Sequence, residues 1–272
     1  MNKLKIFPFL SQKIAKPSIA LIAGISSTIL FAIPVYAATL GQNLIVNGDA
    51  EQGQGDAIGN AVGADIPFIP GWISSDSFSV LQYGATGFEF TNALGNIVAV
   101  SGLPDANNLG PSVRGKNLFF GGANRASSSA SQLIDIADLA SIIDVGQGAY
   151  DLSAWLGGYG TDLDNVAFSL NFLNQDGQSL NTTLITSPTP DERNNTTGLL
   201  FKSTKGFVPI GARQINVALD MNYVRGRVND GYADNLSLVI TKVPEPSISD
   251  LLLVSSSCLM VWKLRRNRQL LS

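Results

Sequence analysis

The sequence predicts an all-β domain, either a sandwich or a barrel, between residues 38 and 243. Apolar side chains at Val166, Phe168, Leu170 and Phe172 alternate with polar or small ones, and a period of two is typical of a half-buried strand. Gly, Asn, Ser and Thr separate many short apolar stretches, and sustained patterns of period 3.6 are lacking. Short strands with glycine-rich connections favour a sandwich or a barrel.

The expected elements follow from local patterns. Asp176-Gly177 offers turn geometry after the strand at 166–172 and before a strand at 180–185, which predicts a hairpin. One helical turn is expected over 137–143, with Asp138 as its cap. The other expected strands are 43–46, 78–82, 97–100, 117–120, 132–136, 150–155, 199–203, 214–220 and 236–241.

Two connections stand out by composition. Residues 53–71 are rich in glycine and contain Pro67 and Pro70, and residues 121–131 form a polar run with Arg125 and several serines. Long loops on a rigid β scaffold commonly hold binding functions, but they can equally be flexible exposed connections.

Composition excludes several chemistries. The chain has no histidine, so it cannot supply a Ser-His-Asp or Cys-His relay or an imidazole-bound zinc. The single cysteine, Cys258, lies in an apolar tail, so residues 38–243 hold neither a disulfide nor a thiolate nucleophile. These residues carry ten basic and nineteen acidic side chains, a net charge of -9, which argues against a nucleic-acid partner.

The first segment predicts export. Four lysines precede an apolar stretch from Ile19 to Ile33, and Val35-Tyr36-Ala37 presents small side chains at the positions that a signal peptidase needs. Residues 1–37 are therefore interpreted as a secretory signal peptide, with a permanent N-terminal anchor as the alternative.

The last segment, residues 244–272, combines Pro244-Glu245-Pro246, an apolar span from Ile248 to Leu264, and a basic cluster of Arg265, Arg266 and Arg268. Such a helix spans about 25 Å, slightly less than a hydrocarbon core of about 30 Å. Arginines after the span would stay cytoplasmic and leave the domain on the far side of the membrane.

These three features, in this order at the extreme terminus, resemble the PEP-CTERM sorting signal of bacterial exported proteins. The resemblance implies recognition and processing by an exosortase-type enzyme after transient anchoring in the inner membrane. It further implies release to the cell surface or the extracellular matrix. An ordinary tail anchor is the alternative.

The two ends of the domain carry a second resemblance. The stretches Asn43 to Glu51 and Asp230 to Leu238 are similar to the first and last strands of galactose-binding-like jelly rolls, a fold that many carbohydrate-binding modules share. Residues 121–135 fit the same fold as a loop that enters a strand. The resemblance implies a jelly-roll β-sandwich whose first and last strands lie side by side and share a structural calcium ion.

The positions that match the calcium ligands are Glu51 and Asp234. Calcium prefers six to eight oxygen ligands, which carboxylates and carbonyls can supply without histidine. The alternative is that both residues are solvated loop acids.

Glycan binding needs aromatic faces for sugar rings and planar polar groups for hydroxyls. Trp155 is expected in the core and Tyr159 on the surface, with Arg125, Asp162, Asp164 and Asn165 as polar partners. The other aromatic candidates are Trp72, Tyr83, Tyr223 and Tyr232.

Catalysis is not expected. The pairs Asp162 with Asp164, Asp191 with Glu192 and Asp230 with Asp234 could suggest glycoside hydrolysis, but acids in loops are usually only solvated. The leading hypothesis is an exported, non-catalytic surface or matrix protein that binds extracellular polysaccharide. The alternatives are a structural surface protein without a small ligand and a carboxylate-dependent glycan hydrolase.

Overall fold

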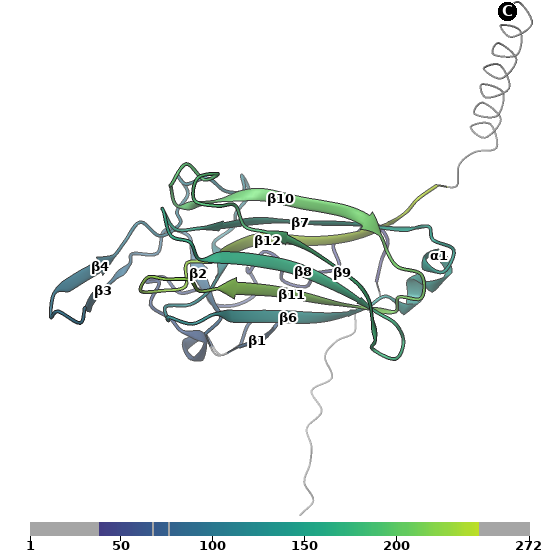
Figure 1. The fold of residues 1–272 in the computed structure, drawn as a ribbon, viewed down its shortest axis with the longest axis horizontal. Coiled ribbons are helices and arrows are strands. Elements are labelled where there is room, and N and C mark those ends of the chain that lie inside the picture. The colour runs from purple at the N-terminus through teal and green to yellow at the C-terminus, as the bar shows by residue number, and fades with distance from the viewer. Residues whose placement is uncertain (1–37, 67, 76, 245–272) are drawn as a thin grey trace, which may run out of the picture. The chain divides into compact units, whose positions relative to one another are not determined.

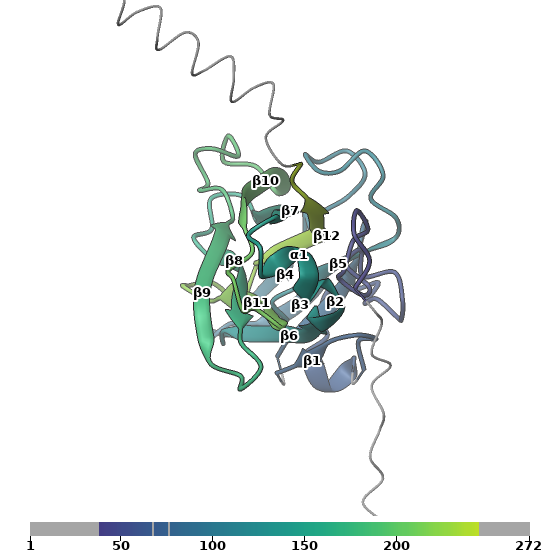
Figure 2. The same cartoon turned by 90° about the vertical axis from the view of Figure 1, so that its right-hand side faces the viewer.

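In a computed structural model of the chain, the described residues are 38–66, 68–75 and 77–244. They form two antiparallel five-stranded sheets packed face to face, which confirms the predicted all-β sandwich (Figure 1, Figure 2). The signal segment and the sorting segment from Glu245 onward lie outside the described residues. Within the described part, no helix is long and apolar enough to cross a membrane.

The elements have the following bounds in chain order: η1 (Gly63–Asp65), β1 (Ile73–Ser74), β2 (Ser79–Gln82), β3 (Phe88–Thr91), β4 (Ile97–Val100), β5 (Asn117–Phe120), β6 (Ser128–Asp135), η2 (Ala137–Leu139), α1 (Ala140–Ile143), β7 (Gly148–Gly158), β8 (Asn165–Leu173), β9 (Ser179–Thr186), β10 (Gly198–Phe207), β11 (Gln214–Asn222) and β12 (Tyr232–Lys242).

The strand order is that of a jelly roll. Sheet A has the order β10-β7-β12-β5-β2, and sheet B has the order β1-β6-β11-β8-β9. From β5 onward, the eight strands cross repeatedly between the sheets, and each sheet takes four of them. This is the double Greek-key arrangement of a jelly roll, so the topology itself confirms the expected fold.

The main core lies between the two sheets. Along β8, the buried residues are Val166, Phe168, Leu170 and Phe172, in strict alternation with half-buried ones. The inner faces of β7, β11 and β12 add side chains with the same alternation, including Leu152, Val217 and Leu238. The period-two pattern of the sequence therefore marks the inner face correctly.

A second, smaller core lies on the outer face of sheet A. Leu118, Phe120, Leu199 and Tyr232 point away from the main core and pack with residues of the long connections, such as Leu103. The Phe120 and Tyr232 rings stack with centroids 5.8 Å apart. Because these connections cover one end of the outer face only, the other end of sheet A is open.

The two ends of the domain lie side by side, as the jelly-roll resemblance implies. Asn43 and Val239 form an antiparallel bridge, and the Leu44 N–H donates to the carbonyl of Leu238 at 2.8 Å. The Asn43 side chain accepts from the Leu238 N–H at 2.9 Å. The expected strand at 43–46 is reduced to this bridge because turns occupy the residues that follow.

The structure corrects three local expectations. η2 and α1 occupy the expected helical turn, but Ile136 is the N-cap residue and Asp138 lies inside the first turn, so Asp138 is not the cap. The polar run at 121–131 is only partly a loop, because β6 begins at Ser128 and alternates small buried and half-buried side chains.

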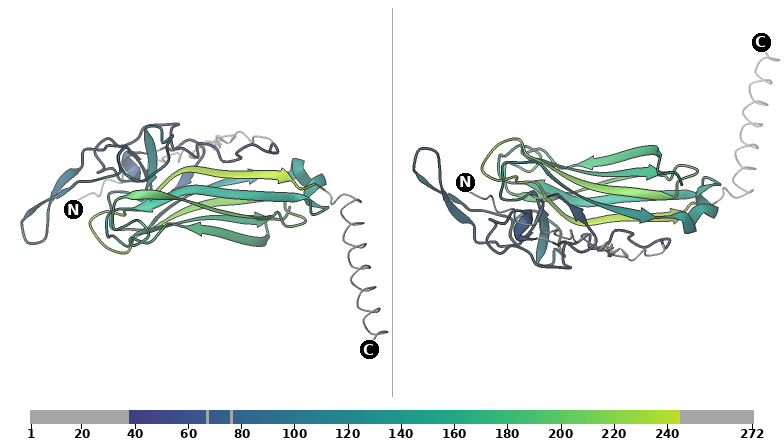
Figure 3. Two further views of the ribbon diagram at one scale, coloured as in Figure 1. Left: turned by 90° about the horizontal axis from the view of Figure 1, so that it is seen from above. Right: turned by 90° about the horizontal axis from the view of Figure 1, so that it is seen from below.

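The third correction concerns β3, which the sequence does not predict. It pairs with β4 in a two-stranded hairpin that projects beyond the strand ends of the sandwich (Figure 1, Figure 3). Its Phe88 and Phe90 rings face the guanidinium of Arg227 at 5.7 and 5.0 Å.

Replacing a core ring should destabilise the domain far more than replacing an exposed ring. Phe168 is fully buried, so Phe168→Ala is expected to lower the free energy of unfolding by about 3–5 kcal/mol in urea titrations. Phe207, a strand residue that is 63% exposed, is the matched control, and Phe207→Ala should change stability by at most about 0.5 kcal/mol. Equal losses in the two variants would contradict the assigned inner face.

Candidate functional site

The open end of sheet A carries an aromatic pair. Phe201 of β10 is in register with Trp155 of β7, and their rings make an edge contact with centroids 5.8 Å apart. Phe201 is 55% exposed, whereas Trp155 is half-buried and points outward, away from the main core. The expectation that Trp155 belongs to the core is met only in part, because Trp155 is half-buried and packs against the second core instead of lying in the main core. We call Trp155, Phe201 and the neighbouring outward-facing Ser153 and Ser203 the aromatic platform.

A strap formed by residues 109–113 borders the platform. Leu109 pairs with Gly198 at the start of β10, and the carbonyl of Val113 accepts a hydrogen bond from the Asn235 side chain on β12 at 2.9 Å. The strap therefore crosses the outer face of sheet A from β10 to β12.

Arg114 fixes this strap in place. Its guanidinium donates to the carbonyls of Asp105 at 2.8 Å, Asn108 at 3.2 Å and Pro111 at 3.1 Å. The same group lies 5.3 Å from the centre of the Tyr83 ring, a cation–π distance. Because Pro111 belongs to the strap and Asp105 and Asn108 precede it, this one side chain ties the strap to the chain before it.

Asp234 of β12 lies in the same cross-strand row as Phe201 of β10 and Trp155 of β7. It is opposite Trp155 in the register of β12 with β7, and its carboxylate accepts from the Tyr83 hydroxyl at 2.8 Å and the Asn235 N–H at 2.7 Å. Burial, together with the negative charges of Glu51 and Asp49, raises the pKa of Asp234 to about 7, against the lowering effect of the two hydrogen bonds.

Glu51 lies in the same neighbourhood as Asp234. One of its oxygens accepts from the N–H groups of Lys116 and Asn117, both at 2.7 Å, and the Tyr83 N–H binds the carbonyl of Lys116. The two expected calcium ligands, Glu51 and Asp234, are therefore close enough for their charges to act on each other.

The side chains there carry oxygen donors of the kind that a hard cation binds. The Asn117 side-chain oxygen is buried and has no hydrogen-bond partner among the described residues, and the carboxylates of Glu51 and Asp234 have further lone pairs. Oxygen donors of this kind are the ligands that calcium prefers.

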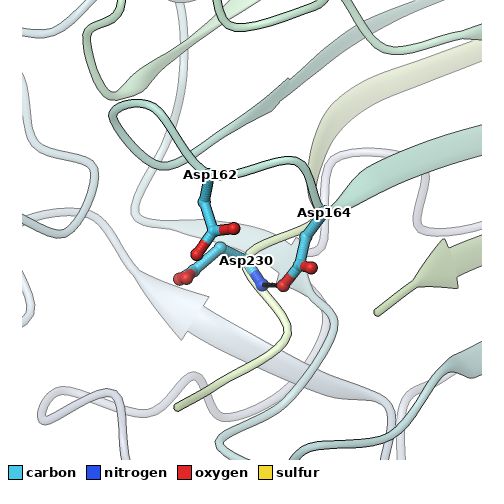
Figure 4. Close-up of side chains that lie close together, drawn as sticks. All are labelled: Asp162, Asp164 and Asp230. Carbon is cyan, nitrogen blue, oxygen red and sulfur yellow. Dashed lines mark hydrogen bonds between the residues drawn. The ribbon is translucent and has the colours of Figure 1, made fainter. Parts of the chain in front are cut away.

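A separate acidic group lies at the loop end of the sandwich. Asp162 and Asp164 come from the β7–β8 loop, Asp230 comes from the β11–β12 loop, and one carboxylate oxygen of each lies within 4.8 Å of the others (Figure 4). We call these residues the acidic triad. Among the described residues, it is the group of three acids compact enough to share a cation.

Hydrogen bonds tie the acidic triad to the loops. Asp164 accepts from the N–H groups of Val224 at 2.6 Å and Asp230 at 2.9 Å, and Asp230 accepts from the Tyr232 hydroxyl at 2.9 Å. Burial, together with the charges of Asp162 and Asp164, raises the pKa of Asp230 to about 8, against the lowering effect of the Tyr232 hydrogen bond and the charge of Arg193. Asp230 is thus a proton-holding group at neutral pH.

The buried side chain of Arg193 donates hydrogen bonds to the backbone of the β7–β8 loop. This arginine is 1% exposed, and it donates to the carbonyls of Gly158 at 2.8 Å and Thr196 at 2.6 Å. It also reaches the carbonyl of Asp162 at 3.4 Å. Because its bonds go to carbonyls, it positions the loop without neutralising a triad carboxylate directly.

The other expected glycan residues are dispersed. Tyr159 is half-buried, packs against the second core and donates to the Ser101 carbonyl at 2.7 Å, so it is less free than expected. Asn165 accepts from the Asn222 side chain at 3.1 Å at the start of β8. Arg125 is exposed on the 121–127 loop and makes no hydrogen bond or ion pair to any described residue.

The remaining aromatic candidates are mostly structural. Trp72 is buried and donates to the Asn47 carbonyl, Tyr232 is buried in the second core, and Tyr223 donates to the Gly226 carbonyl. Sequence reasoning missed Phe201 and Arg114. A signal for Phe201 is present in the sequence, because every second residue from Leu199 to Lys205 lies on one face of β10 and Phe201 is on that face.

Comparisons with known proteins assign no family. No family model matches the chain, and no curated protein matches it. The chain is similar to the enzymatically active domain of tailspike protein 4 of Bacteriophage CBA120, with a TM-score of 0.41, 14% identity and 73% of this chain covered. It spans only 21% of that tailspike chain.

Two other similar structures are carbohydrate-binding modules. One is a family 16 carbohydrate-binding module, with a TM-score of 0.37, 18% identity, and 72% of this chain and 99% of that chain covered. The other is the CBM22-1 xylan-binding domain of Paenibacillus barcinonensis Xyn10C, with a TM-score of 0.36, 11% identity, and coverage of 76% and 100%. At these TM-scores, the neighbours assign no ligand to this chain.

Stability should fall as the pH rises from 5 to 8. Asp230 keeps its proton up to about pH 8 in the folded state, whereas the unfolded group loses it near the ordinary value of 3.8, so rising pH favours unfolding across this interval. Asp230→Asn keeps an acceptor for Tyr232 and should reduce the difference between urea stabilities at pH 5 and pH 8.

The measurement is made with a chelator present, and Asp176→Asn is the control because Asp176 is exposed in the β8–β9 turn. The chain has no histidine that could titrate in the same interval. A pH difference that is identical in Asp230→Asn and the wild-type chain would contradict the role given to Asp230.

Proposed function

We propose that this chain is an exported, non-catalytic glycan-binding protein of the cell surface or extracellular matrix, and that the aromatic platform is its binding surface. The observation that carries this proposal is the exposed Phe201 ring braced edge-on by Trp155 on an open sheet face. A ring held in this way offers a flat apolar surface to a sugar at little cost in side-chain entropy.

The surroundings of the platform favour a neutral polysaccharide. Ser153 and Ser203 are in register beside the rings and offer hydroxyls, and further along the same strands Lys205 and Asp151 neutralise each other in an ion pair of 2.7 Å. The net charge of -9 over residues 38–243 would repel a polyanionic glycan. Hydrogen bonds and ring stacking are therefore the interactions available for recognition.

Binding is proposed in place of catalysis because the acids are poorly placed for a substrate. Asp230 is 5% exposed and Asp234 is fully buried beneath Tyr83. Glu192, next to Asp191 in the pair considered for hydrolysis, accepts hydrogen bonds from Thr189 in the same loop and from Lys202 of β10. A hydrolase needs two carboxyl groups that reach one glycosidic bond.

Export and processing by an exosortase-type enzyme are part of the proposal, on the basis of the sequence features of residues 1–37 and 244–272. A structural calcium ion held by Glu51 and Asp234 is also proposed. A bound Ca²⁺ would neutralise the two carboxylates and link the beginning of the domain to its last strand. The acidic triad is the competing location for a cation.

Truncating the exposed ring should weaken binding to neutral polysaccharide. In affinity electrophoresis of the full-length chain through xylan or hydroxyethylcellulose, Phe201→Ala should weaken retardation by about ten-fold, the loss typical of a central aromatic contact. Phe68→Ala is the matched control because Phe68 is 72% exposed and lies in the 53–71 loop. Alginate, a polyanion, should retard neither variant.

Two results would count against the proposal. Unchanged retardation of Phe201→Ala would remove the platform as the binding surface. A wild-type chain that migrates freely through xylan and hydroxyethylcellulose would favour the alternative of a structural surface protein.

Removal of calcium should destabilise the domain. Exhaustive chelation is expected to lower the melting temperature by about 5–10 °C if the free Ca²⁺ concentration before chelation is roughly 100 times the dissociation constant of the site. Added Ca²⁺ should restore the melting temperature. Glu51→Gln should abolish this response, whereas Asp162→Asn should retain it. The reverse pattern would move the ion to the acidic triad, and an unchanged melting temperature would refute calcium binding.

A further inference from the structure

A surface pocket of about 440 Å³ lies where the first described segment meets β12. Asp49, Gln52, Asn235 and Ser237 contribute to its lining, together with the backbone around Gly48. Ser237 also belongs to the outer face of sheet A, since it is in register with Ser153 of the aromatic platform. The pocket therefore continues the row of hydroxyls that runs beside the aromatic pair.

The pocket has rigid walls and free polar groups. Asn47 is occupied in holding the backbone, because it donates to the Pro70 carbonyl at 3.0 Å and accepts from the Gln52 N–H at 2.8 Å. In contrast, the side-chain amide of Gln52 and the hydroxyl of Ser237 make no hydrogen bond to the described residues. Fixed walls with unpartnered donors and acceptors are suited to capture a ligand that carries several hydroxyl groups.

The charge of the pocket selects against acidic ligands. Its lining includes the carboxylate of Asp49 and no basic side chain. An anionic sugar would meet this carboxylate without a compensating cation, whereas a neutral sugar can donate hydroxyl hydrogen bonds to it.

The pocket and the aromatic platform lie at a spacing that one extended ligand can span. The order across the sheet is β10, β7, β12 and then the first segment, which pairs with β12 through Asn43. Three strand spacings separate the edge at Phe201 from the pocket, roughly 14 Å. A disaccharide on the platform would leave the pocket empty, and a longer chain would reach both.

We infer that this pocket is a second sugar subsite, which hydrogen-bonds one unit of a neutral polysaccharide while other units lie across Trp155 and Phe201. This inference rests on the proposed function and specifies its substrate class as internal stretches of a neutral glycan. Affinity should therefore rise with ligand length until both subsites are filled.

The experiment compares two ligand lengths in two neutral series. Isothermal titration of the full-length chain uses xylohexaose and cellohexaose against xylobiose and cellobiose. Gln52→Ala should weaken hexasaccharide binding about five-fold, the effect of one lost hydrogen bond, and leave disaccharide binding unchanged. Phe201→Ala should weaken both lengths. Gln54→Ala is the matched control because Gln54 is an exposed amide two residues away and outside the pocket lining.

The outcomes separate the two proposals. Hexasaccharide binding that depends on Phe201 but is the same in Gln52→Ala as in the wild-type chain would overturn the second subsite and leave the proposed function intact. Equal affinity of the wild-type chain for disaccharide and hexasaccharide would do the same. A wild-type chain that binds neither length, and is not retarded by xylan or hydroxyethylcellulose, would overturn both.

Discussion

A register shift in β12 is the constraint on which the candidate sites depend. Asp234 is opposite Trp155 and Ser237 is opposite Ser153, so β12 holds one residue more than β7 over this stretch. The extra residue, Asn235, takes a left-handed conformation with φ of 49°. This keeps Leu236 in the core while Asp234 and Ser237 both face outward. Without it, either the core contact of Leu236 or the row shared with the platform would be lost.

The same strand joins the two ends of the domain to the outer face of sheet A. Gly48 sits so close to the Leu236 carbonyl that a side chain there would clash with it, and Asn47 and Ala50 have positive φ angles of 52° and 58°. Non-glycine residues adopt such angles only where the surrounding structure requires them. The turn that follows Asn47 thereby forms the pocket wall and delivers Glu51 to the Lys116–Asn117 peptide.

Two buried acids, Asp230 and Asp234, form no ion pair with a described residue. Asp230 and Asp234 both have raised pKa values because burial penalises their charged forms, and neighbouring carboxylates add to the effect. Each acid compensates by hydrogen bonding to a tyrosine hydroxyl, from Tyr232 and Tyr83. An acidic, histidine-free domain with such groups favours oxygen-bound cations and neutral ligands over polyanions.

The sequence by itself determined most of the strands, because alternation with a period of two is a local property that marks the buried face of a long strand, as in β8. The chain-end motifs around Glu51 and Asp234 indicated that distant segments would meet, and they do. What only the tertiary structure decided is which outward-facing positions stay open. Trp155 and Tyr232 both point outward from sheet A, yet Trp155 is only half-buried at the margin of the second core, whereas Tyr232 is fully buried within it. The difference comes from non-local connections that cover one end of the sheet, and no pattern within a single strand records that coverage.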